Sequence, residues 1–410
     1  MPSTSTLRLT AALLPLAFAA PALAQGQQQS QQQQRQQPKN QVESVYLGDM
    51  AIRALEVAKD LKEPWGMAFL PDGRMLVTEK PGNLVIVSAD GEVSRPLGGT
   101  PAVFAQGQGG LMDVALHPDF ARNQMVYLSF AEHGDGATAG TALGRARLVE
   151  DRLEGWEVIW RQDKVEGPNH FGNRIVFTPD GEHLYLALGE RFKFGPAQDL
   201  ANTLGTVIRL NADGSVPRDN PFRGRRGADG AIWSYGHRNI EAAAMHPDTG
   251  QLWVAEMGPL GGDELNAVER GANYGWPVVS WGINYDGVDI PDPTEYPQYK
   301  DAAYHWNPVR SPSGMIVYTG AMFPQWRGNV IFGSLSAGGL ERVEVNGDRV
   351  AATHFIPLNT RIREVEQGPD GAIYLLTNDR EHGKGAVWRL EPMDVRPASA
   401  DGDRSGPGSD

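Results

Sequence analysis

One short pattern recurs along the chain: a turn built around Pro-Asp, a short run of β-forming residues, and then a glycine or a polar break. Proline sets the backbone of the second turn position, and Asp and Gly suit the positions after it. The runs that follow alternate or are wholly apolar, as buried antiparallel strands are. The six turns and their runs are 69–73 with 75–79, 117–119 with 126–129, 178–181 with 184–187, 246–248 with 252–255, 323–326 with 330–332, and 368–371 with 373–376; the fifth is a looser copy with Pro-Gln.

The copies are spaced about 45 to 77 residues apart, which leaves room for a four-stranded unit with large insertions. Sustained helical periodicity is scarce between them. Six such units in radial order predict an all-β fold, a six-bladed β-propeller of four-stranded antiparallel blades. One or two irregular β-sandwiches are the alternative, but six similar patterns favour the propeller. Functional residues are then expected on loops at one mouth of the central channel.

The ends of the chain differ from its body. Arg8, the short apolar run 9–20 and the small-x-small site 22–24 are typical of a signal peptide. An uncleaved N-terminal anchor is the alternative, disfavoured by Pro15 and by a run too short to span a bilayer. We therefore expect a periplasmic or secreted protein with no membrane span. The predicted parts are a signal peptide, a Gln-rich disordered linker, the propeller catalytic domain and a disordered tail, at 1–24, 25–42, 43–393 and 394–410.

Charge and cysteine content narrow the function. The net charge is −13, so we expect no nucleic-acid partner, because that role requires a basic face. The chain contains no cysteine. Disulfides, thiol nucleophiles, iron–sulfur clusters and thiolate metal sites are therefore excluded.

His170 is a candidate for catalysis. It lies in the Gly-containing loop 169–174 just before a predicted strand, and Glu190 follows at the end of the next strand. A histidine oriented by a carboxylate is a general-base arrangement. A lone histidine is more often structural, so this pairing is a hypothesis drawn from adjacent strand ends.

Two clusters suit a flat, anionic ligand. Gln108 stands between glycines in the loop 107–113, which lacks the ending of a phosphate loop and suits a close backbone approach to a flat ligand. Arg361 and Arg363 alternate, so in a strand both side chains point to one face. Surface salt bridges are the ordinary interpretation, but two arginines on the inner edge of an acidic protein suggest a polyanionic ligand.

The segment 256–266 is rich in carboxylates and free backbone. Ca²⁺ binds carboxylate and carbonyl oxygens in such irregular loops, although the spacing does not match an EF-hand. A metal-free acidic turn is the alternative interpretation.

Taken in order, eight motifs resemble the soluble aldose sugar dehydrogenases that use pyrroloquinoline quinone (PQQ), within the broader glucose/sorbosone dehydrogenase family. The resemblance covers about residues 45 to 391. No single motif is decisive, whereas the ordered set is highly specific. The motifs are 64–73, 107–114, 170–174, 236–239, 258–266, 273–277, 312–315 and 361–363.

The resemblance implies a six-bladed propeller that binds PQQ and calcium at one end. By motif, His170 matches the general base, and Glu190 stands where the family usually has Asp to orient that histidine. Arg238 is expected to stabilise charge on the quinone oxygen. The matching cofactor contacts are Gln108, Arg238, Asn239, Tyr285, Arg361 and Arg363. The matching calcium ligands are the carbonyls of Gly258 and Pro259, and a calcium site in the aldose branch matches Glu264 and Tyr274.

Two positions depart from the family pattern. Ser336 stands where many members have Lys, so one cationic contact to the cofactor is lost. Asn173 replaces a glycine that is frequent in the motif following His170, which would alter the mouth.

The implied activity is oxidation of the anomeric hydroxyl of an aldose sugar to the lactone. His170 would take the proton, hydride would pass to PQQ, and Ca²⁺ would polarise a quinone carbonyl. Reoxidation needs an external electron acceptor, a quinone or a cytochrome, and the chain would be a monomer or homodimer. Two alternatives stay open. A calcium-dependent propeller lactonase is opposed by the arginine pair, and a non-catalytic sugar- or partner-binding propeller is kept open by Ser336.

Overall fold

The computed structural model describes residues 40–48 and 50–393 of the 410-residue chain. The predicted signal peptide, the predicted tail and nearly all of the predicted linker lie outside these residues. By their contacts the residues divide into Met1–Gln41 and Val42–Asp410, and the second unit builds the propeller. No helix in the described part of the chain is long and apolar enough to cross a membrane.

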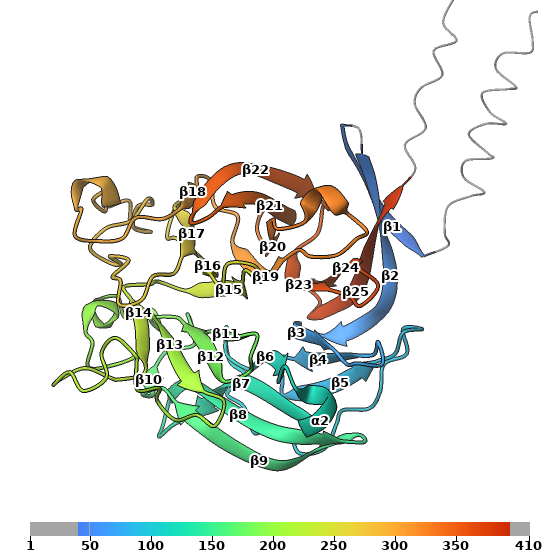
Figure 1. The fold of residues 1–410 in the computed structure, drawn as a ribbon, viewed down its shortest axis with the longest axis horizontal. Helices are drawn as coiled ribbons and strands as arrows, with labels where there is room; N and C mark the ends of the chain where they lie inside the picture. Colours follow the sequence, from blue (N-terminus) through green and yellow to red (C-terminus); the bar gives the residue numbers. More distant parts are fainter. Residues whose placement is uncertain (1–39, 49, 394–410) are drawn as a thin grey trace, which may run out of the picture. The chain divides into compact units, whose positions relative to one another are not determined.

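Six antiparallel sheets surround a central channel (Figure 1), which confirms the predicted six-bladed propeller. The strands of each blade are given from the channel outward. The first blade contains β3 (Pro64–Phe69), β4 (Met75–Glu79) and β5 (Asn83–Val87), and the second contains β6 (Leu111–Leu116), β7 (Met125–His133) and β8 (Thr138–Val149), with β9 (Arg152–Arg161) and β10 (Val165–Glu166) both paired to β8. The third blade contains β11 (Gly172–Phe177), β12 (His183–Leu188), β13 (Thr206–Asn211) and β14 (Ile232–Tyr235), and the fourth contains β15 (Ile240–Met245), β16 (Leu252–Glu256), β17 (Asp263–Ala267) and β18 (Tyr304–Trp306).

The fifth blade contains β19 (Pro312–Val317), β20 (Val330–Ser334), β21 (Gly339–Asn346) and β22 (Arg349–Pro357). The sixth blade contains β23 (Ile362–Gln367), β24 (Ile373–Thr377), β25 (Lys384–Met393), β2 (Met50–Lys62) and β1 (Gln41–Leu47). Pairing of β2 with β25 closes the ring with strands from both ends of the chain. The first blade has three strands, and the second and sixth have a fifth. Helices in the described residues are short: α2 (Phe120–Asn123) and the 3₁₀ turns η1 (Gly195–Gln198), η2 (Pro293–Glu295) and η3 (Pro324–Trp326).

The innermost strands β3, β6, β11, β15, β19 and β23 each pack against their two neighbours around the channel. Asp113, Arg174 and Glu364 each take the third position of their inner strand, and Arg174 contacts both carboxylates. Equal positions therefore lie at one level, so β6, β11 and β23 run in the same direction. All six repeated turns join an innermost strand to the second strand of its blade, which places them at one end of the channel.

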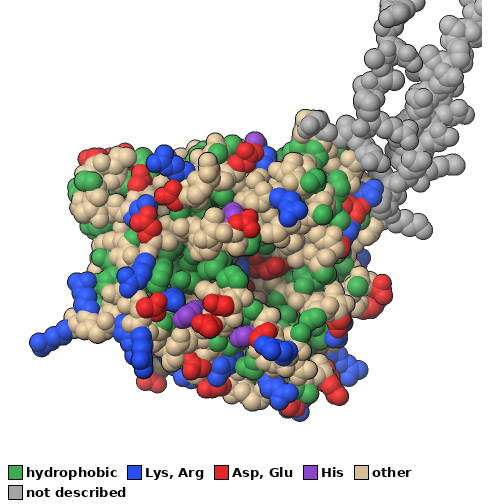
Figure 2. Space-filling model, in the orientation of Figure 1, with side chains coloured by type: hydrophobic (Ala, Val, Ile, Leu, Met, Phe, Trp, Pro, Cys, Tyr) green, Lys and Arg blue, Asp and Glu red, His purple; other side chains and the backbone are tan. Residues whose placement is uncertain are grey.

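Apolar side chains fill the spaces between blades. The second strands carry continuous apolar runs because both of their faces are covered by neighbouring blades; Leu184, Leu186 and Leu188 of β12 are fully buried. The core is thus distributed around the ring. The channel, in contrast, adds charged residues to an apolar lining: Asp113, Arg174, Glu364 and Glu366 border its cavity, and Figure 2 shows charged side chains at the bottom of the central hollow.

Candidate functional site

The predicted site residues gather at the end of the channel opposite the repeated turns. Gln108, His170, Arg238 and Arg361 lie just before innermost strands, and Glu190 lies just after a second strand, which runs the other way. Starts of first strands and ends of second strands meet at the same mouth. The fold therefore brings together loops that are far apart in sequence.

His170 is held from both sides. Its Nδ1 lies 2.7 Å from Glu190 Oε1, and its backbone N–H donates to Gln108 Oε1 at 2.7 Å. No described residue hydrogen-bonds to its Nε2, so this nitrogen is available to a substrate. Burial lowers the pKa of His170, the Arg238 charge lowers it further, and the Glu190 contact partly offsets this. The imidazole is therefore neutral at neutral pH, the form that a general base requires.

Glu190 is fully buried and has two tasks. One carboxylate oxygen faces His170, and the other accepts backbone N–H groups from Lys193 and, at 2.8 Å, Phe194. Beside it, the guanidinium of Arg191 donates to the carbonyls of Asn169, Gly167 and Ala139, which fixes the His170 loop. Sequence reasoning did not single out Arg191. The only sequence feature that pointed to Arg191 was its position as a charged residue shortly after the buried strand β12.

Arg238 lies at the centre of a second contact set. Its Nη1 donates to the carbonyls of Met257 and Gly258 at 2.8 Å each, and its Nη2 lies 3.1 Å from the hydroxyl of Tyr285. Its backbone N–H donates to Glu256 at 2.6 Å. Tyr285 is 57% exposed and so forms part of the rim. Arg238 and Tyr285, predicted separately, are thus in direct contact.

The remaining predicted contacts lie on the inner wall. Arg363 Nη1 pairs with Glu241 at 2.9 Å, and Glu241 also accepts from the Asn239 amide at 3.2 Å. Arg361 donates only to the carbonyl of Leu335, at 2.9 Å. Glu241, missed from the sequence, links two predicted contacts. Its position two residues after Asn239, on the same strand face, was the available signal.

Several buried polar atoms at this mouth have no hydrogen-bond partner within the described chain. They include Nε of Arg238, Arg361 and Arg363, and Oδ1 of Asn239. Burial lowers the pKa of both Arg361 and Arg363, and the charge of Arg363 lowers that of Arg361 further. Buried polar groups are normally paired. A planar ligand with several carboxylates, such as PQQ, fits the three arginine Nε donors, whereas Asn239 Oδ1 is an acceptor and requires a donor from the ligand or water.

The two departures from the family pattern have different surroundings. Ser336 is exposed in the loop after β20, next to Leu335, whose carbonyl holds Arg361. Asn173 is fully buried with φ 98°, at a bulge in β11, and its amide contacts Met112. This backbone region suits glycine and tolerates Asn better than most residues. The side chain of Asn173 is therefore packed against the neighbouring inner strand β6.

Gly258, Glu264 and Tyr274 line one small cavity, together with Arg238 and Glu256. Burial raises the pKa of Glu264 well above its usual range, and nearby Glu256 raises it further. The neighbouring Pro259 is buried. Asp263 does not face a cation: it accepts three backbone N–H groups, and burial raises its pKa to about 6. Within the described residues, no three His, Asp or Glu side chains are arranged to hold a metal, so a cation here would depend on carbonyls.

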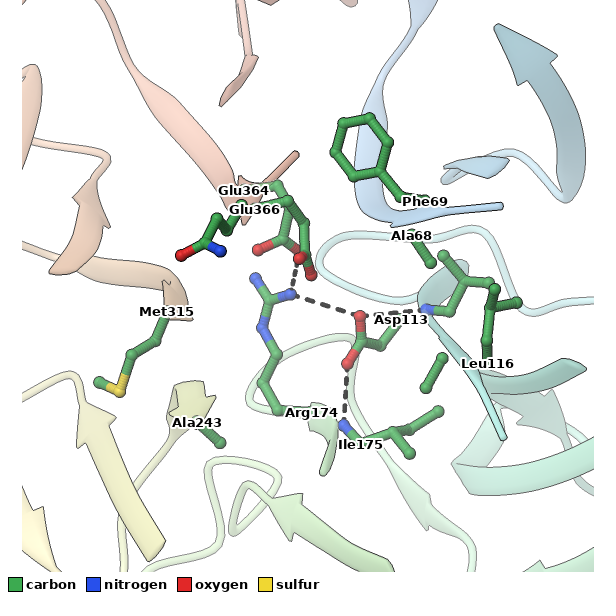
Figure 3. Close-up of a pocket in the computed structure, with 13 residues that line it drawn as sticks. Ala68, Phe69, Asp113, Leu116, Arg174, Ile175, Ala243, Met315, Glu364 and Glu366 are labelled. Carbon is green, nitrogen blue, oxygen red and sulfur yellow. Dashed lines mark hydrogen bonds and ion pairs between the residues drawn. The ribbon is translucent and has the colours of Figure 1, made fainter. Parts of the chain in front are cut away.

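A cavity of about 320 Å³ occupies the channel beyond the site (Figure 3). Arg174 pairs there with Glu364 and Asp113, and Glu366 lies nearby. Burial raises the pKa of Glu364 to about 7 and raises the pKa of Glu366 well above its usual range. Arg174 also donates to the carbonyl of Glu241 at 2.6 Å. This network lies in the channel behind the predicted site and ties four blades together, because the four residues come from β6, β11, β15 and β23.

Comparison with known proteins identifies the family of the chain. The family described as Glucose / Sorbosone dehydrogenase matches residues 61–389. The aldose sugar dehydrogenase YliI of Escherichia coli is 43% identical over 352 residues, 82% of this chain and 92% of that protein. The crystal structure of the apo form of the soluble aldose sugar dehydrogenase from Escherichia coli has a TM-score of 0.78 at 39% identity, and covers 83% of this chain and 100% of that chain.

The structure of the PQQ-bound form of aldose sugar dehydrogenase from Streptomyces coelicolor has a TM-score of 0.70 at 29% identity, and covers 85% of this chain and 99% of that chain. The chain thus shares the propeller fold of solved aldose sugar dehydrogenases. The chain belongs to the glucose/sorbosone dehydrogenase family, a family of oxidoreductases, which confirms the resemblance inferred from the ordered motifs.

Proposed function

We propose that the protein is a PQQ-dependent aldose dehydrogenase that oxidises the anomeric hydroxyl of aldose sugars to the lactone. The observation that carries this proposal is the set of unpartnered atoms on Arg238, Asn239, Arg361 and Arg363 around the His170–Glu190 pair. Positive and amide groups suited to a planar polyanion lie beside a neutral, oriented histidine. The PQQ-bound relative supports the choice of cofactor.

In this proposal His170 removes the proton of the anomeric hydroxyl through Nε2, because Nδ1 is occupied by Glu190. Glu190 keeps the ring oriented and stabilises the imidazolium that forms. Arg238 places a positive charge where negative charge develops. When bound, PQQ supplies the two-electron chemistry by accepting a hydride from the sugar carbon, and an external acceptor, a quinone or a cytochrome, reoxidises it.

We further propose calcium as part of the site. The carbonyls of Gly258 and Pro259 are candidate ligands for a cation that polarises the cofactor, and Glu264 and Tyr274 border the same cavity. A divalent cation would stabilise the ionised form of Glu264, which burial disfavours. A periplasmic or secreted location, and a monomeric or homodimeric state, remain proposals drawn from the sequence.

The two alternatives from the sequence are not favoured. A calcium-dependent lactonase has no use for three buried arginine Nε donors left without a partner near its base. A binding-only propeller has no use for a histidine whose burial, hydrogen bonding and pKa suit proton removal. The family match agrees with an oxidoreductase.

The test is reconstitution. Purified apoprotein is supplied with PQQ and Ca²⁺, and reduction of an artificial dye is measured with several aldoses. We expect aldose-dependent dye reduction only when PQQ is present. Hydrolysis of an aldonolactone is measured in parallel. Lactone hydrolysis without any aldose-dependent dye reduction, at saturating PQQ and Ca²⁺, would refute the proposal in favour of a lactonase.

A further inference from the structure

The loop after Glu190 has an unusual backbone. Arg191, Phe192 and Phe194 all have positive φ, at 59°, 58° and 61°. Non-glycine residues seldom adopt this region, and such residues cluster at functional sites, where the surrounding structure holds them in place. Here the restraints are explicit: the second oxygen of Glu190 accepts the backbone N–H groups of Lys193 and Phe194, and Arg191 is tied to three carbonyls.

This backbone places Phe192 at the mouth. Phe192 is 39% exposed, although a phenylalanine is normally buried. The ring meets His170 edge-on with 5.0 Å between ring centroids, and it lies 5.1 Å from Phe194. The ring of Tyr285 faces it at 6.4 Å. An exposed aromatic ring thus borders the side chain that we propose as the base.

The charges around Phe192 distinguish it from the other aromatic residues of the mouth. The guanidinium of Arg238 lies over the rings of Trp276 and Tyr285, at 5.2 and 5.6 Å. No cation in the described residues lies over Phe192. A neutral ligand therefore suits this ring better than the anionic cofactor does. A sugar ring is such a ligand, because it presents an apolar C–H face that an aromatic ring can cover.

We propose that Phe192 is a specificity-determining residue that stacks on the C–H face of a pyranose while the anomeric hydroxyl reaches His170 Nε2. The inference rests on the proposed function. In this arrangement Glu190 has two roles, because its carboxylate orients the proposed base His170 and also holds the loop that carries Phe192. The distance between the His170 ring and the Phe192 ring is therefore fixed by the same residue.

The experiment uses reconstituted holoenzyme with D-glucose as the probe. Phe192→Ala removes the ring, Phe192→Leu keeps apolar volume without a ring, and Phe192→Tyr restores the ring. Tyr46→Ala is the matched control, because Tyr46 is an exposed aromatic residue on β1, in a different blade. For each variant KM and kcat are measured, together with PQQ affinity by absorbance titration and the thermal midpoint.

We expect Phe192→Ala and Phe192→Leu to raise KM by about three- to tenfold, with kcat within about twofold and PQQ affinity unchanged. Phe192→Tyr and Tyr46→Ala should match the wild type. An unchanged KM in both ring-free variants, or a loss of PQQ affinity in them, would overturn the inference; the second result would assign the ring to the cofactor. Wild-type protein that binds no PQQ would instead refute the proposed function.

Discussion

The two ends of the propeller channel differ in how their polar groups are paired. At the turn end, aspartates satisfy the backbone of their own turns: Asp72, Asp180 and Asp370 accept the N–H groups of Arg74, Glu182 and Ala372, each two residues further on. At the site end, buried arginine and asparagine atoms have no partner in the described chain. His170, Arg191 and Phe192 also adopt positive φ there.

This difference assigns different roles to the two ends: the turn end stabilises the fold, and the site end is arranged for binding. The turn end repeats one local solution, in which each turn satisfies its own backbone from its own side chains. The site end brings unrelated loops together and leaves polar groups unpaired, a cost that the rest of the ring must offset. Substitutions at the turn end should therefore change stability, whereas substitutions at the site end should change binding and rate.

The largest contrast is expected between His170→Ala and Asp180→Ala. Removal of the base should lower kcat by about 10²- to 10⁴-fold, because general-base catalysis contributes that much, while PQQ still binds. Asp180→Ala should lower the thermal midpoint by a few degrees and leave kcat unchanged. Dye-reduction kinetics and thermal unfolding measure both. Wild-type kcat in His170→Ala would remove His170 from the proposed role.

Calcium removal should act only on the site end. Chelation should release PQQ or abolish activity, and added Ca²⁺ should restore both, because no described cation pairs with the buried Glu264, whereas the carbonyl of Gly258 already accepts from Arg238. Calcium affinity should also fall with decreasing pH, since burial raises the pKa of Glu264 and protonation competes with the metal. Exhaustively chelated protein that retains full PQQ occupancy and activity would contradict a calcium requirement.

A smaller effect is expected at Ser336. Ser336→Lys should tighten PQQ binding by about one to two decades, the value of one charge-assisted hydrogen bond to a carboxylate. The loop lies beside Arg361, as the contact to Leu335 shows. Apoprotein of both forms is titrated with PQQ at fixed Ca²⁺. Unchanged or weaker binding in Ser336→Lys would mean that this loop does not face the cofactor.

The smallest effect concerns pH. Activity requires neutral His170, so it should fall as pH drops through the lowered pKa of this residue. Glu190 raises that pKa, so Glu190→Gln should move the acid limb of kcat/KM lower still, by about one pH unit at most. The kcat should fall as well, because the imidazolium loses its partner. An acid limb that shifts upward in Glu190→Gln would show that Glu190 does not act on His170.

The repeated turns made the fold predictable from sequence, because Pro-Asp turns between apolar runs are local signals. The site was less accessible. His170 and Glu190 could be paired from strand ends, because they flank the paired strands β11 and β12 of one blade. The contact of His170 with Gln108, which comes from the neighbouring blade, depends on the closed ring and could not be predicted. Glu241 and Arg191 escaped notice because their sequence signals, a position near Asn239 and a position near a strand end, do not reveal burial or hydrogen-bond partners. Phe192 escaped notice because a positive φ at phenylalanine has no sequence signature. The calcium ligands rest on resemblance, since backbone carbonyls carry no side-chain signal.

The central claim is that the unpaired groups at the mouth bind PQQ. It is tested most directly by absorbance titration of apoprotein with PQQ at fixed Ca²⁺, comparing wild type with Arg361→Gln and Arg209→Gln. Arg209 is the matched control: its Nε is also buried and unpartnered, but its Nη1 pairs with Asp219, away from the mouth. We predict saturable binding by wild type, about 10- to 100-fold weaker binding by Arg361→Gln, and no change in Arg209→Gln. Absence of saturable binding, or equal affinity in wild type and Arg361→Gln, would contradict the claim.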